Sequence, residues 1–247
     1  MNSDRKIPWP RIAVEGVAIV ASILLAFSID AWWANQVDSI EEKEILTALQ
    51  REFETNLVTL EEQLSYREAV RASANLILTA AAGKTRLEPA ELDRLLGDIV
   101  WVGWVDLSTG ALASLLQSGQ LSLIKNQKLR EQLAALPYWE GNTAKLEESE
   151  LLHLNADIYP FLSEHAYLPQ IHNTMKGQPG VGINLYPTEQ PTSEARNHTY
   201  LLQNPKFVGM ISVELVDHND AIWGYGILKE KFEAAIRMIE SELAIPE

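Results

Sequence analysis

The stretch IAVEGVAIVASILLAFSIDAWW, residues 12 to 33, decides how this chain is organised. Wound as an α-helix that rises roughly 1.5 Å per residue, it reaches about 33 Å, enough to cross the hydrocarbon core of a bilayer. Glu15 and Asp30 are the only charged residues within it, and both lie near its ends. The length and the composition together predict a single membrane-spanning helix.

Tryptophans flank this stretch on both sides. Trp9 precedes it, and Trp32 and Trp33 close it, where aromatic side chains are enriched at membrane–water interfaces. We therefore predict that all three are interfacial anchors. The rival interpretation is a cleaved signal peptide, with Ala26 and Ser28 as the small residues before the cut. The paired tryptophans have no role in a cleavage region, so they favour the span.

Basic residues near the span predict its orientation. Arg5, Lys6 and Arg11 come before it, whereas Lys43 is the only basic residue among the next 15 residues after it. Lys and Arg accumulate on the cytoplasmic side of a span. We therefore expect the N-terminus to be cytoplasmic and the rest of the chain to lie on the other side, in a periplasm if the cell has one.

Composition limits the classes of protein to which the chain can belong. Its 247 residues leave room for one domain of about 200 residues beyond the span, which is ample for a buried core. A formal net charge of -14 argues against binding nucleic acid through phosphates and against lying flat on anionic lipid. The chain has no cysteine, which excludes disulfides, thiolate metal sites and cysteine nucleophiles.

One face of the span is a candidate surface for a partner helix. Ala18, Ser22, Ala26 and Asp30 recur every fourth residue and so share a face. Small residues at this spacing let a second helix approach closely, although alanine and serine are common in spans in any case. A carboxylate at this depth is costly and often functional, and Asp30 has no basic residue within one turn.

A long helix is predicted directly after the span. No proline or glycine occurs from Gln36 to Ala82, and Gly83 is placed to end the helix. Apolar residues recur mostly at gaps of three or four, which favours a long surface helix of a bundle over a coiled coil because no second heptad strand is in view. They are Ile45, Leu49, Phe53, Leu57, Leu60, Leu64 and Val70.

Shorter helices are predicted in the middle of the chain from caps and breakers. The predicted helices run from Leu87 to Trp104 with Pro89 in the first turn, from Ser108 or Thr109 to a break at Ser118-Gly119, from Gln127 to Leu136 with Asn126 as cap and Pro137 as stop, and from Asn142 or Thr143 to Pro160. The aromatic turn WVGWV, residues 101 to 105, is interpreted as core packing.

The texture changes after Tyr167. Prolines and glycines are frequent over residues 167–204, which predicts a long irregular insertion, and such loops are often binding surfaces. Asn204 and Pro205 then form a strong helix start, and the final helix is predicted to reach about Leu243. We expect that helix to return antiparallel along the long helix that follows the span.

The predicted fold is therefore all-α, a single span that continues into a multi-helix extracytoplasmic domain with one long proline-rich loop. The predicted parts are a cytoplasmic lead over residues 1–11, a transmembrane helix over 12–34, and a helical, periplasmic domain over 35–247 that contains the irregular insertion 167–204.

No catalytic or metal motif meets its structural requirements. Glu150-x-x-His153 has the spacing found on helices of carboxylate-bridged di-iron bundles, but such a site needs a second copy, and Glu214 and His218 are four residues apart. We interpret Glu150 and His153 as part of a solvated helix face. GQPGVG, residues 177 to 182, lacks the strand, helix and GK[ST] of a phosphate cradle. We predict no catalytic residue, no cofactor and no metal site.

Two stretches resemble an uncharacterised family of bacterial single-span membrane proteins. The first runs from RIAVEG at residue 11 through ILLA at residue 23 to IDAWW at residue 29, and the second is SGQLSLIKN, residues 118 to 126, followed by Leu129, Arg130 and Leu133. The resemblance covers about the first 135 residues. It implies an N-terminal anchor, a long charged helix, a helical domain and a place in a bacterial inner membrane, but no activity.

Two functions from different classes follow. The first is a non-enzymatic accessory or scaffolding subunit of a larger bacterial membrane complex, for which an energy-converting, respiratory or photosynthetic assembly would be suitable. Its partners would be other membrane subunits, bound through the span and through loop 167–204. The alternative is a membrane-tethered periplasmic domain for ligand binding or sensing, with a pocket near Trp101, Trp104 and Trp139.

Overall fold

The computed structural model describes residues 9–101, 103–175 and 198–244, and side chains from Glu15 onward. Throughout these residues the secondary structure is helical, with no strand, which confirms the all-α prediction for them. The Leu87–Trp104 helix, the break at Gly119 and the helix starts after Asn126 and Asn204 all have counterparts within a few residues.

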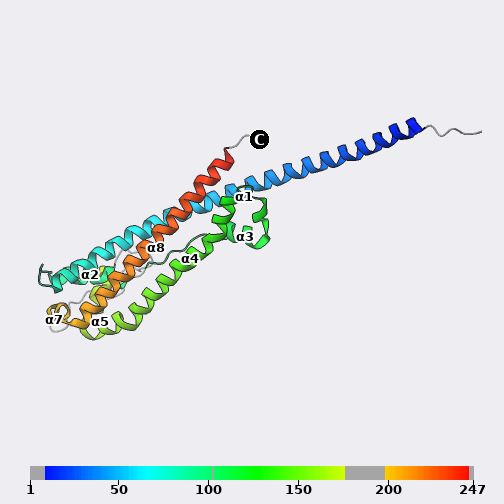
Figure 1. Ribbon diagram of the computed structural model, residues 1–247. Coiled ribbons are helices and arrows are strands. Elements are labelled where there is room, and N and C mark those ends of the chain that lie inside the picture. The colour runs from blue at the N-terminus through cyan, green and yellow to red at the C-terminus, as the bar shows by residue number, and fades with distance from the viewer. Residues whose placement is uncertain (1–8, 102, 176–197, 245–247) are drawn as a thin grey trace, which may run out of the picture.

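Helix α1, Trp9–Ala81, is the axis of the molecule (Figure 1). Its 73 residues correspond to about 110 Å of uninterrupted helix. It ends where the sequence predicted, because Gly83 adopts a positive φ of 71°, and its N–H donates to the carbonyl of Ala80 at 2.9 Å. The absence of glycine and proline from Gln36 onward lets one helix serve both the apolar stretch and the bundle.

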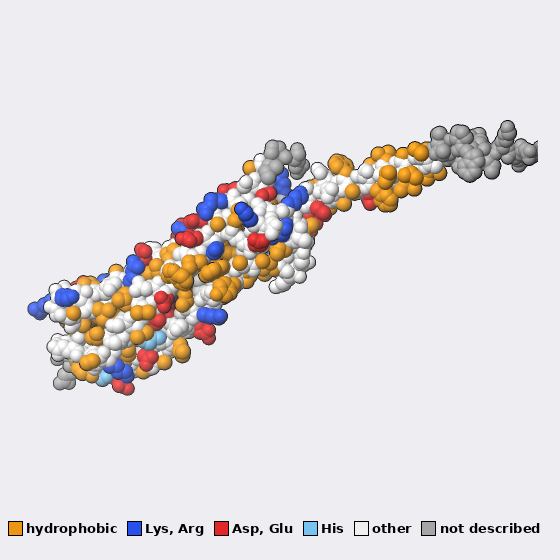
Figure 2. All heavy atoms as spheres, viewed as in Figure 1, with side chains coloured by type: hydrophobic (Ala, Val, Ile, Leu, Met, Phe, Trp, Pro, Cys, Tyr) orange, Lys and Arg blue, Asp and Glu red, His pale blue; other side chains and the backbone are white. Residues whose placement is uncertain are grey.

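Within the described part of the chain, no other element covers α1 before it enters the bundle. Its apolar side chains project from an isolated helix (Figure 2), and Leu24 and Phe27 expose 60% and 67% of their surface. Burial begins only at Glu42 and Leu46. This is the one helix among the described residues that is long and apolar enough to cross a membrane. Residues 12 to 33 are hereafter called the apolar stretch.

Three long helices form the bundle beyond that point. Helix α8, Pro205–Leu243, runs antiparallel along α1 and ends near the place where α1 leaves the bundle, as predicted. Helix α4, Gln127–His153, packs against the other side of α8. The sequence starts both helices with an asparagine cap, since Asn126 accepts from the N–H of Leu129 and Asn204 from that of Lys206.

Shorter elements cover the two ends. They are α2 (Pro89–Val100), α3 (Gly110–Ser118), the 3₁₀ turn η1 (Gln120–Leu123), the π-helical turn η2 (Leu154–Ile158), α5 (Tyr159–His165), α6 (Leu168–Thr174) and α7 (His198–Gln203). Helix α3 and η1 lie at the end nearer the apolar stretch, and α2, α5, α6 and α7 at the far end (Figure 1).

The apolar core is divided into two clusters. The near cluster includes Leu49 and Phe53 of α1 with Phe232 of α8, where the two phenylalanine rings lie 5.0 Å apart. The far cluster includes Ile77 of α1 and Ile211 of α8. Polar side chains of the same three long helices lie between these clusters.

Two predictions about helix boundaries are wrong. Pro137 does not stop the helix that Asn126 starts, and Asn142 and Thr143 lie inside α4 rather than opening a new helix. A proline inside a helix removes one backbone hydrogen bond and costs about 3 kcal/mol. Leu133 and Leu136, just before it, are completely buried in the near cluster, and this packing offsets the cost.

The region 167–204 is not irregular throughout. It contains α6 and α7, and residues 176–197 between them lie outside the described part of the chain. Pro169 occupies the first turn of α6, where a proline is tolerated because its missing N–H has no partner within the helix. Close packing of α6 on α2 is possible because of Gly97, since a Cβ there would lie 2.0 Å from Thr174 Oγ1.

Candidate functional site

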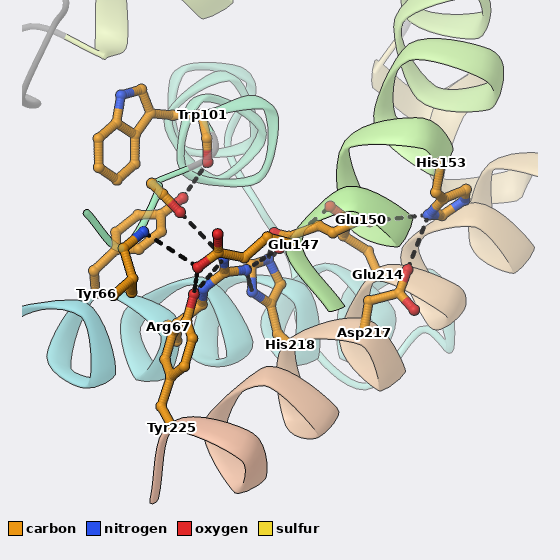
Figure 3. A network of polar contacts seen from close by, with 12 residues as sticks. Tyr66, Arg67, Trp101, Glu147, Glu150, His153, Glu214, Asp217, His218 and Tyr225 are labelled. Carbon is orange, nitrogen blue, oxygen red and sulfur yellow. Dashed lines mark hydrogen bonds and ion pairs between the residues drawn. The ribbon is translucent and has the colours of Figure 1, made fainter. Parts of the chain in front are cut away.

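A buried layer of polar side chains separates the two apolar clusters (Figure 3). We call it the polar layer. Its buried members are Arg67 of α1, Glu147 and Glu150 of α4, and Glu214, His218 and Tyr225 of α8, and at its edge lie His153 and Asp217. Ionisable side chains are seldom buried unless they are paired, so a layer of this kind in a helical core marks a candidate functional site.

Helical spacing brings these residues together. Arg67 lies three residues after Leu64 and three before Val70, so it continues the buried stripe of α1. Glu147 and Glu150 are likewise one turn apart on α4, which puts both on one face. Each helix therefore points its polar side chains inward at the same level of the bundle.

Arg67 occupies the centre of the polar layer and is 0% exposed. Its Nη1 donates to Glu150 Oε2 and lies 3.1 Å from His218 Nδ1, while its Nη2 donates to the carbonyl of Gly103 at 3.2 Å and to the hydroxyl of Tyr225 at 3.4 Å. Burial alone would lower its pKa, but the charge of Glu150 more than offsets this. The guanidinium is therefore a permanent cation that links all three long helices.

The contact between Arg67 and His218 fixes the protonation of the imidazole. A guanidinium N–H can only donate, so His218 Nδ1 must accept and the ring proton lies on Nε2. Burial and the charge of Arg67 lower the pKa of His218 to about 3, which keeps the ring neutral. Its Nε2 faces Glu150 Oε1 at 3.4 Å and Glu214 Oε1 at 4.0 Å.

Tyr225 extends the network to a segment that has no regular structure. Its hydroxyl donates to Glu147 Oε1, which also accepts from the backbone N–H of Val105 at 3.2 Å. Tyr66 of α1 donates to the carbonyl of Trp101 and packs edge-on against the indole ring, with ring centroids 4.2 Å apart. The polar layer thus also holds the chain between α2 and α3 against α1.

Other side chains of α1, nearer the apolar stretch, also form hydrogen bonds with backbone groups of the segment before and at the start of α3. Asn56 donates to the carbonyl of Ser108 and accepts from its N–H, both at 2.8 Å. The carboxylate of Glu52 accepts from the N–H groups of Ala111 and Leu112, at 2.6 and 3.0 Å, which caps the start of α3. Side chains of α1 therefore satisfy backbone groups that a helix or a sheet would otherwise satisfy.

Negative charge is in excess within the polar layer. Four carboxylates, those of Glu147, Glu150, Glu214 and Asp217, face the single guanidinium of Arg67 among its members. Burial raises the pKa of Glu150 to about 7, against the opposing effect of Arg67. Burial also raises the pKa of Glu214 and of Asp217. An additional proton or cation would therefore be stabilised here.

The edge of the layer holds a second polar group. His153 Nδ1 lies 3.0 Å from Glu214 Oε2 and 3.4 Å from Asp217 Oδ2 (Figure 3). The hydrogen bond to Glu214, partly opposed by burial, raises the pKa of His153. The side chains of His153 and Asp217 are 12% and 22% exposed, whereas that of Glu214 is fully buried. This group therefore connects the buried layer to the solvent.

Several polar atoms of the layer have no hydrogen-bond partner. They are Arg67 Nε, Glu150 Oε1, Glu214 Oε1 and His218 Nε2, while Asp217 Oδ2 has only His153 Nδ1, 3.4 Å away. An unsatisfied buried polar atom costs about 1–3 kcal/mol, and more when it is charged. A water molecule, a shared proton or a metal ion would remove that cost.

The sequence-predicted site residues are not part of this layer. Ala18, Ser22, Ala26 and Asp30 are exposed along one face of the apolar stretch, and Ser22 Oγ donates to the carbonyl of Ala18 at 2.8 Å. The side chain of Trp9 lies outside the described residues.

Trp32 and Trp33, the other predicted anchors, are 60% and 62% exposed at the end of the apolar stretch. The predicted ligand pocket involved three other tryptophans. Of these, Trp101 packs on Tyr66, Trp104 is 55% exposed, and Trp139 lies under Lys231 Nζ at 5.5 Å.

The prediction of a solvated face at Glu150 is wrong, since Glu150 is only 1% exposed and packs against α8. Arg67 was missed altogether, although the sequence contained a signal. The predicted apolar series steps from Leu64 to Val70, and Arg67 falls in the middle of that gap. A charged residue in a buried stripe indicates a buried partner on another helix.

Comparison of the chain with protein-family models, with curated proteins and with solved structures gives no match. The functional argument therefore depends on the sequence and the geometry described above.

Proposed function

We propose that this chain is a non-enzymatic, single-span accessory or scaffolding subunit of a larger bacterial membrane complex. The observation that carries the proposal is the continuity of α1. Its exposed apolar stretch and its buried part in the bundle core belong to one helix without a break. A continuous helix fixes the distance and the direction of the bundle relative to the membrane. A scaffolding subunit requires this rigidity, whereas a flexible linker would suit a free tethered domain.

The proposed topology is a cytoplasmic N-terminus and a bundle on the periplasmic side of an inner membrane. Basic residues before the span and acidic residues after it support this orientation. Only about one turn and a half of exposed helix separates Trp33 from Ser39, whose hydroxyl accepts from Lys125 Nζ at 2.7 Å. The bundle would therefore stand close to the headgroups, within reach of the extramembrane parts of neighbouring subunits.

The proposed contact inside the membrane is the face with Ala18, Ser22, Ala26 and Asp30. Ser22 already satisfies its hydroxyl within α1, so it can lie against a neighbouring helix without a further donor. Asp30 is exposed on the same face, and a carboxylate near the hydrocarbon boundary is stabilised by a donor from a partner. In the periplasm the region 167–204 remains the second proposed contact.

The test is gentle detergent extraction from the native membrane, followed by native electrophoresis and mass spectrometry of the proteins that travel with the chain. A large complex with defined neighbours is expected. Asp30→Leu should release those neighbours, whereas Asp38→Leu, the same change outside the apolar stretch, should not. A lone monomer or dimer would overturn the proposal, and unchanged neighbours in Asp30→Leu would overturn the role of that face.

A membrane-tethered ligand-binding domain is the second candidate. The observation that favours it is the polar layer, whose unpartnered atoms Glu150 Oε1 and Glu214 Oε1 lie deep in the bundle. If this function is correct, the chain purifies alone, and a small ligand raises its Tm. Co-purification of stoichiometric membrane subunits would favour the first candidate.

A further inference from the structure

We propose that His153, Glu214 and Asp217 bind a divalent first-row metal ion such as Zn²⁺ at the edge of the polar layer. This inference concerns the bundle alone and does not depend on the proposed function. Each of the three residues offers one ligand atom, and these atoms lie within 4.8 Å of one another.

The geometry of this group matches that of a metal site. Two ligand atoms that are each about 2.0–2.1 Å from a tetrahedral zinc ion are about 3.3 Å from each other. His153 Nδ1 lies 3.0 Å from Glu214 Oε2 and 3.4 Å from Asp217 Oδ2. A proton on Nδ1 is shared between the two carboxylates in this arrangement, and a metal ion would replace that proton with little movement of the side chains.

A second group of possible ligands is less suitable. Glu150, Glu214 and His218 also bring three ligand atoms within 4.8 Å of one another, and all three residues are buried. However, Arg67 Nη1 lies 3.1 Å from His218 Nδ1, which puts the imidazole proton on Nε2, the atom that would have to bind the metal. The guanidinium therefore leaves a proton on His218 Nε2, and that atom cannot bind a metal ion while it holds the proton.

Two further observations point to a cation at the edge of the layer. Glu214 is 0% exposed, and its Oε1 has no hydrogen-bond partner. The layer also holds four carboxylates against one guanidinium, so a divalent ion would balance most of the excess negative charge. A bare carboxylate in a dry interior is costly, and metal coordination is one of the usual ways in which that cost is removed.

The site can be reached from outside. The side chains of His153 and Asp217 are 12% and 22% exposed, so an ion can enter and a water molecule can fill a fourth position. One imidazole with two carboxylates suits Zn²⁺, Mn²⁺ or Fe²⁺ better than ions that prefer oxygen ligands alone, such as Mg²⁺ and Ca²⁺. Behind the site, the Nε2 of His218 lies 4.0 Å from Glu214 Oε1, the second oxygen of that carboxylate.

The experiment uses the full chain in detergent, stripped with a chelator and then titrated with ZnCl₂. We expect about one tightly bound zinc per chain after dialysis and a rise of several degrees in Tm, because an ion that binds only the folded state stabilises it. His153→Gln and Asp217→Asn should weaken zinc binding by more than the roughly 10- to 100-fold typical of losing an outer-shell partner. Glu214→Gln should abolish the rise in Tm.

Two controls separate this site from the rest of the protein. Glu148→Gln changes an exposed carboxylate of α4 outside the polar layer, and it should keep zinc binding. His165→Gln removes a surface histidine that lies 3.8 Å from Glu164, and it should also keep it. Zinc binding that is absent from the wild type, or equal in all five variants, would overturn the proposal.

The design also covers a variant that fails to fold. Glu214 is fully buried, so Glu214→Gln carries the greater risk, whereas Asp217 lies partly in solvent. If Glu214→Gln is unfolded, Asp217→Asn and the zinc content of the wild type still decide the outcome.

Discussion

Leu24 in the apolar stretch exposes 60% of its surface, whereas Arg67, further along the same helix, exposes none. In a water-soluble domain these two values would be reversed. Among the described residues no other element covers the apolar stretch, whereas the central residues of the polar layer are enclosed by three helices. One helix therefore has two different surroundings. Its side chains are apolar where they are exposed, and they include a buried arginine inside the bundle.

The difference shows what each region requires from its surroundings. Exposed residues such as Leu24 and Phe27 are stable only in contact with lipid or with another apolar helix. Glu150 and Glu214 are stable only when protons or cations balance their charge. Lipid or an apolar helix meets the first requirement, and protons or cations meet the second. Each can be tested by a substitution paired with a control on the same or a neighbouring helix.

The largest effect is expected at the centre of the polar layer. Arg67→Met leaves Glu150 buried without its cation and should destabilise the bundle by about 3–5 kcal/mol, which lowers Tm by roughly 10 °C. The measurement is thermal unfolding followed by circular dichroism. Arg71→Met, one turn later, removes an exposed arginine 3.9 Å from Glu68 and should change stability by less than about 0.5 kcal/mol. Equal stability of both variants would show that the layer contributes nothing.

A charge in the apolar stretch should have the next largest effect. Leu24→Arg, near the centre of the stretch, costs about 2.5–3.5 kcal/mol for membrane insertion. It should reduce the amount of protein in the membrane fraction, because the variant becomes soluble or is degraded. Val58→Arg is the matched control, because Val58 is 58% exposed on the bundle. We expect it to leave membrane attachment unchanged. If both variants behave alike in alkaline extraction, the apolar stretch is not in lipid.

The pH dependence of stability should reveal the buried acids of the polar layer. Glu150 has an ordinary pKa near 4.5 when unfolded and about 7 when folded, raised by burial. The folded state therefore holds the proton more tightly, and the stability that Glu150 contributes is complete below pH 4.5 and is lost as the pH rises through about 7. The charged and titratable groups that face it are Arg67 of α1 and Glu214, Asp217 and His218 of α8.

With a chelator present, we expect the free energy of unfolding to fall by on the order of 2 kcal/mol between pH 5 and pH 7.5. Glu150→Gln cannot titrate and should reduce that slope. Chemical denaturation at the two pH values measures the difference. A slope that is the same in the wild type and in Glu150→Gln would show that Glu150 does not exchange a proton in this range.

The smallest effect is expected from a neutral member of the layer. Tyr225→Phe removes the hydroxyl that joins Arg67 to Glu147 and should cost about 1.5 kcal/mol by leaving both with one fewer hydrogen bond. Tyr138→Phe makes the same change at a side chain that is 65% exposed, and it should have no measurable effect. Denaturant midpoints would compare the two, and equal midpoints would contradict the importance of the network.

Local signals in the sequence predicted much of the fold. Asn126 and Asn204 mark helix starts because a cap needs only its own first turn, and Gly83 marks an end because only its own φ matters. The interior proline of α4 was misjudged for the opposite reason. Pro137 is tolerated because Leu133 and Leu136 are buried against another helix, and no local pattern contains that information.

The polar layer could be predicted only in part. Glu150-x-x-His153 and the pair Glu214 and His218 were visible in the sequence, but the pairing of α4 with α8 depends on tertiary packing. Arg67 was indicated only by the gap between Leu64 and Val70 in the apolar series of the long helix. The sequence of one helix can show that the helix has a polar face. Only the packed structure shows which face of another helix packs against it.

The pairing of α1 with α8 also has a consequence for biosynthesis. Phe53 packs on Phe232, so the buried stripe of α1 meets its main partner only after nearly the whole chain has been made. Contacts so distant in sequence slow folding, and the unpaired stripe is prone to aggregate in the meantime. The nascent chain would therefore need protection until α8 has been synthesised, and truncation before α8 would yield an aggregation-prone fragment rather than a smaller domain.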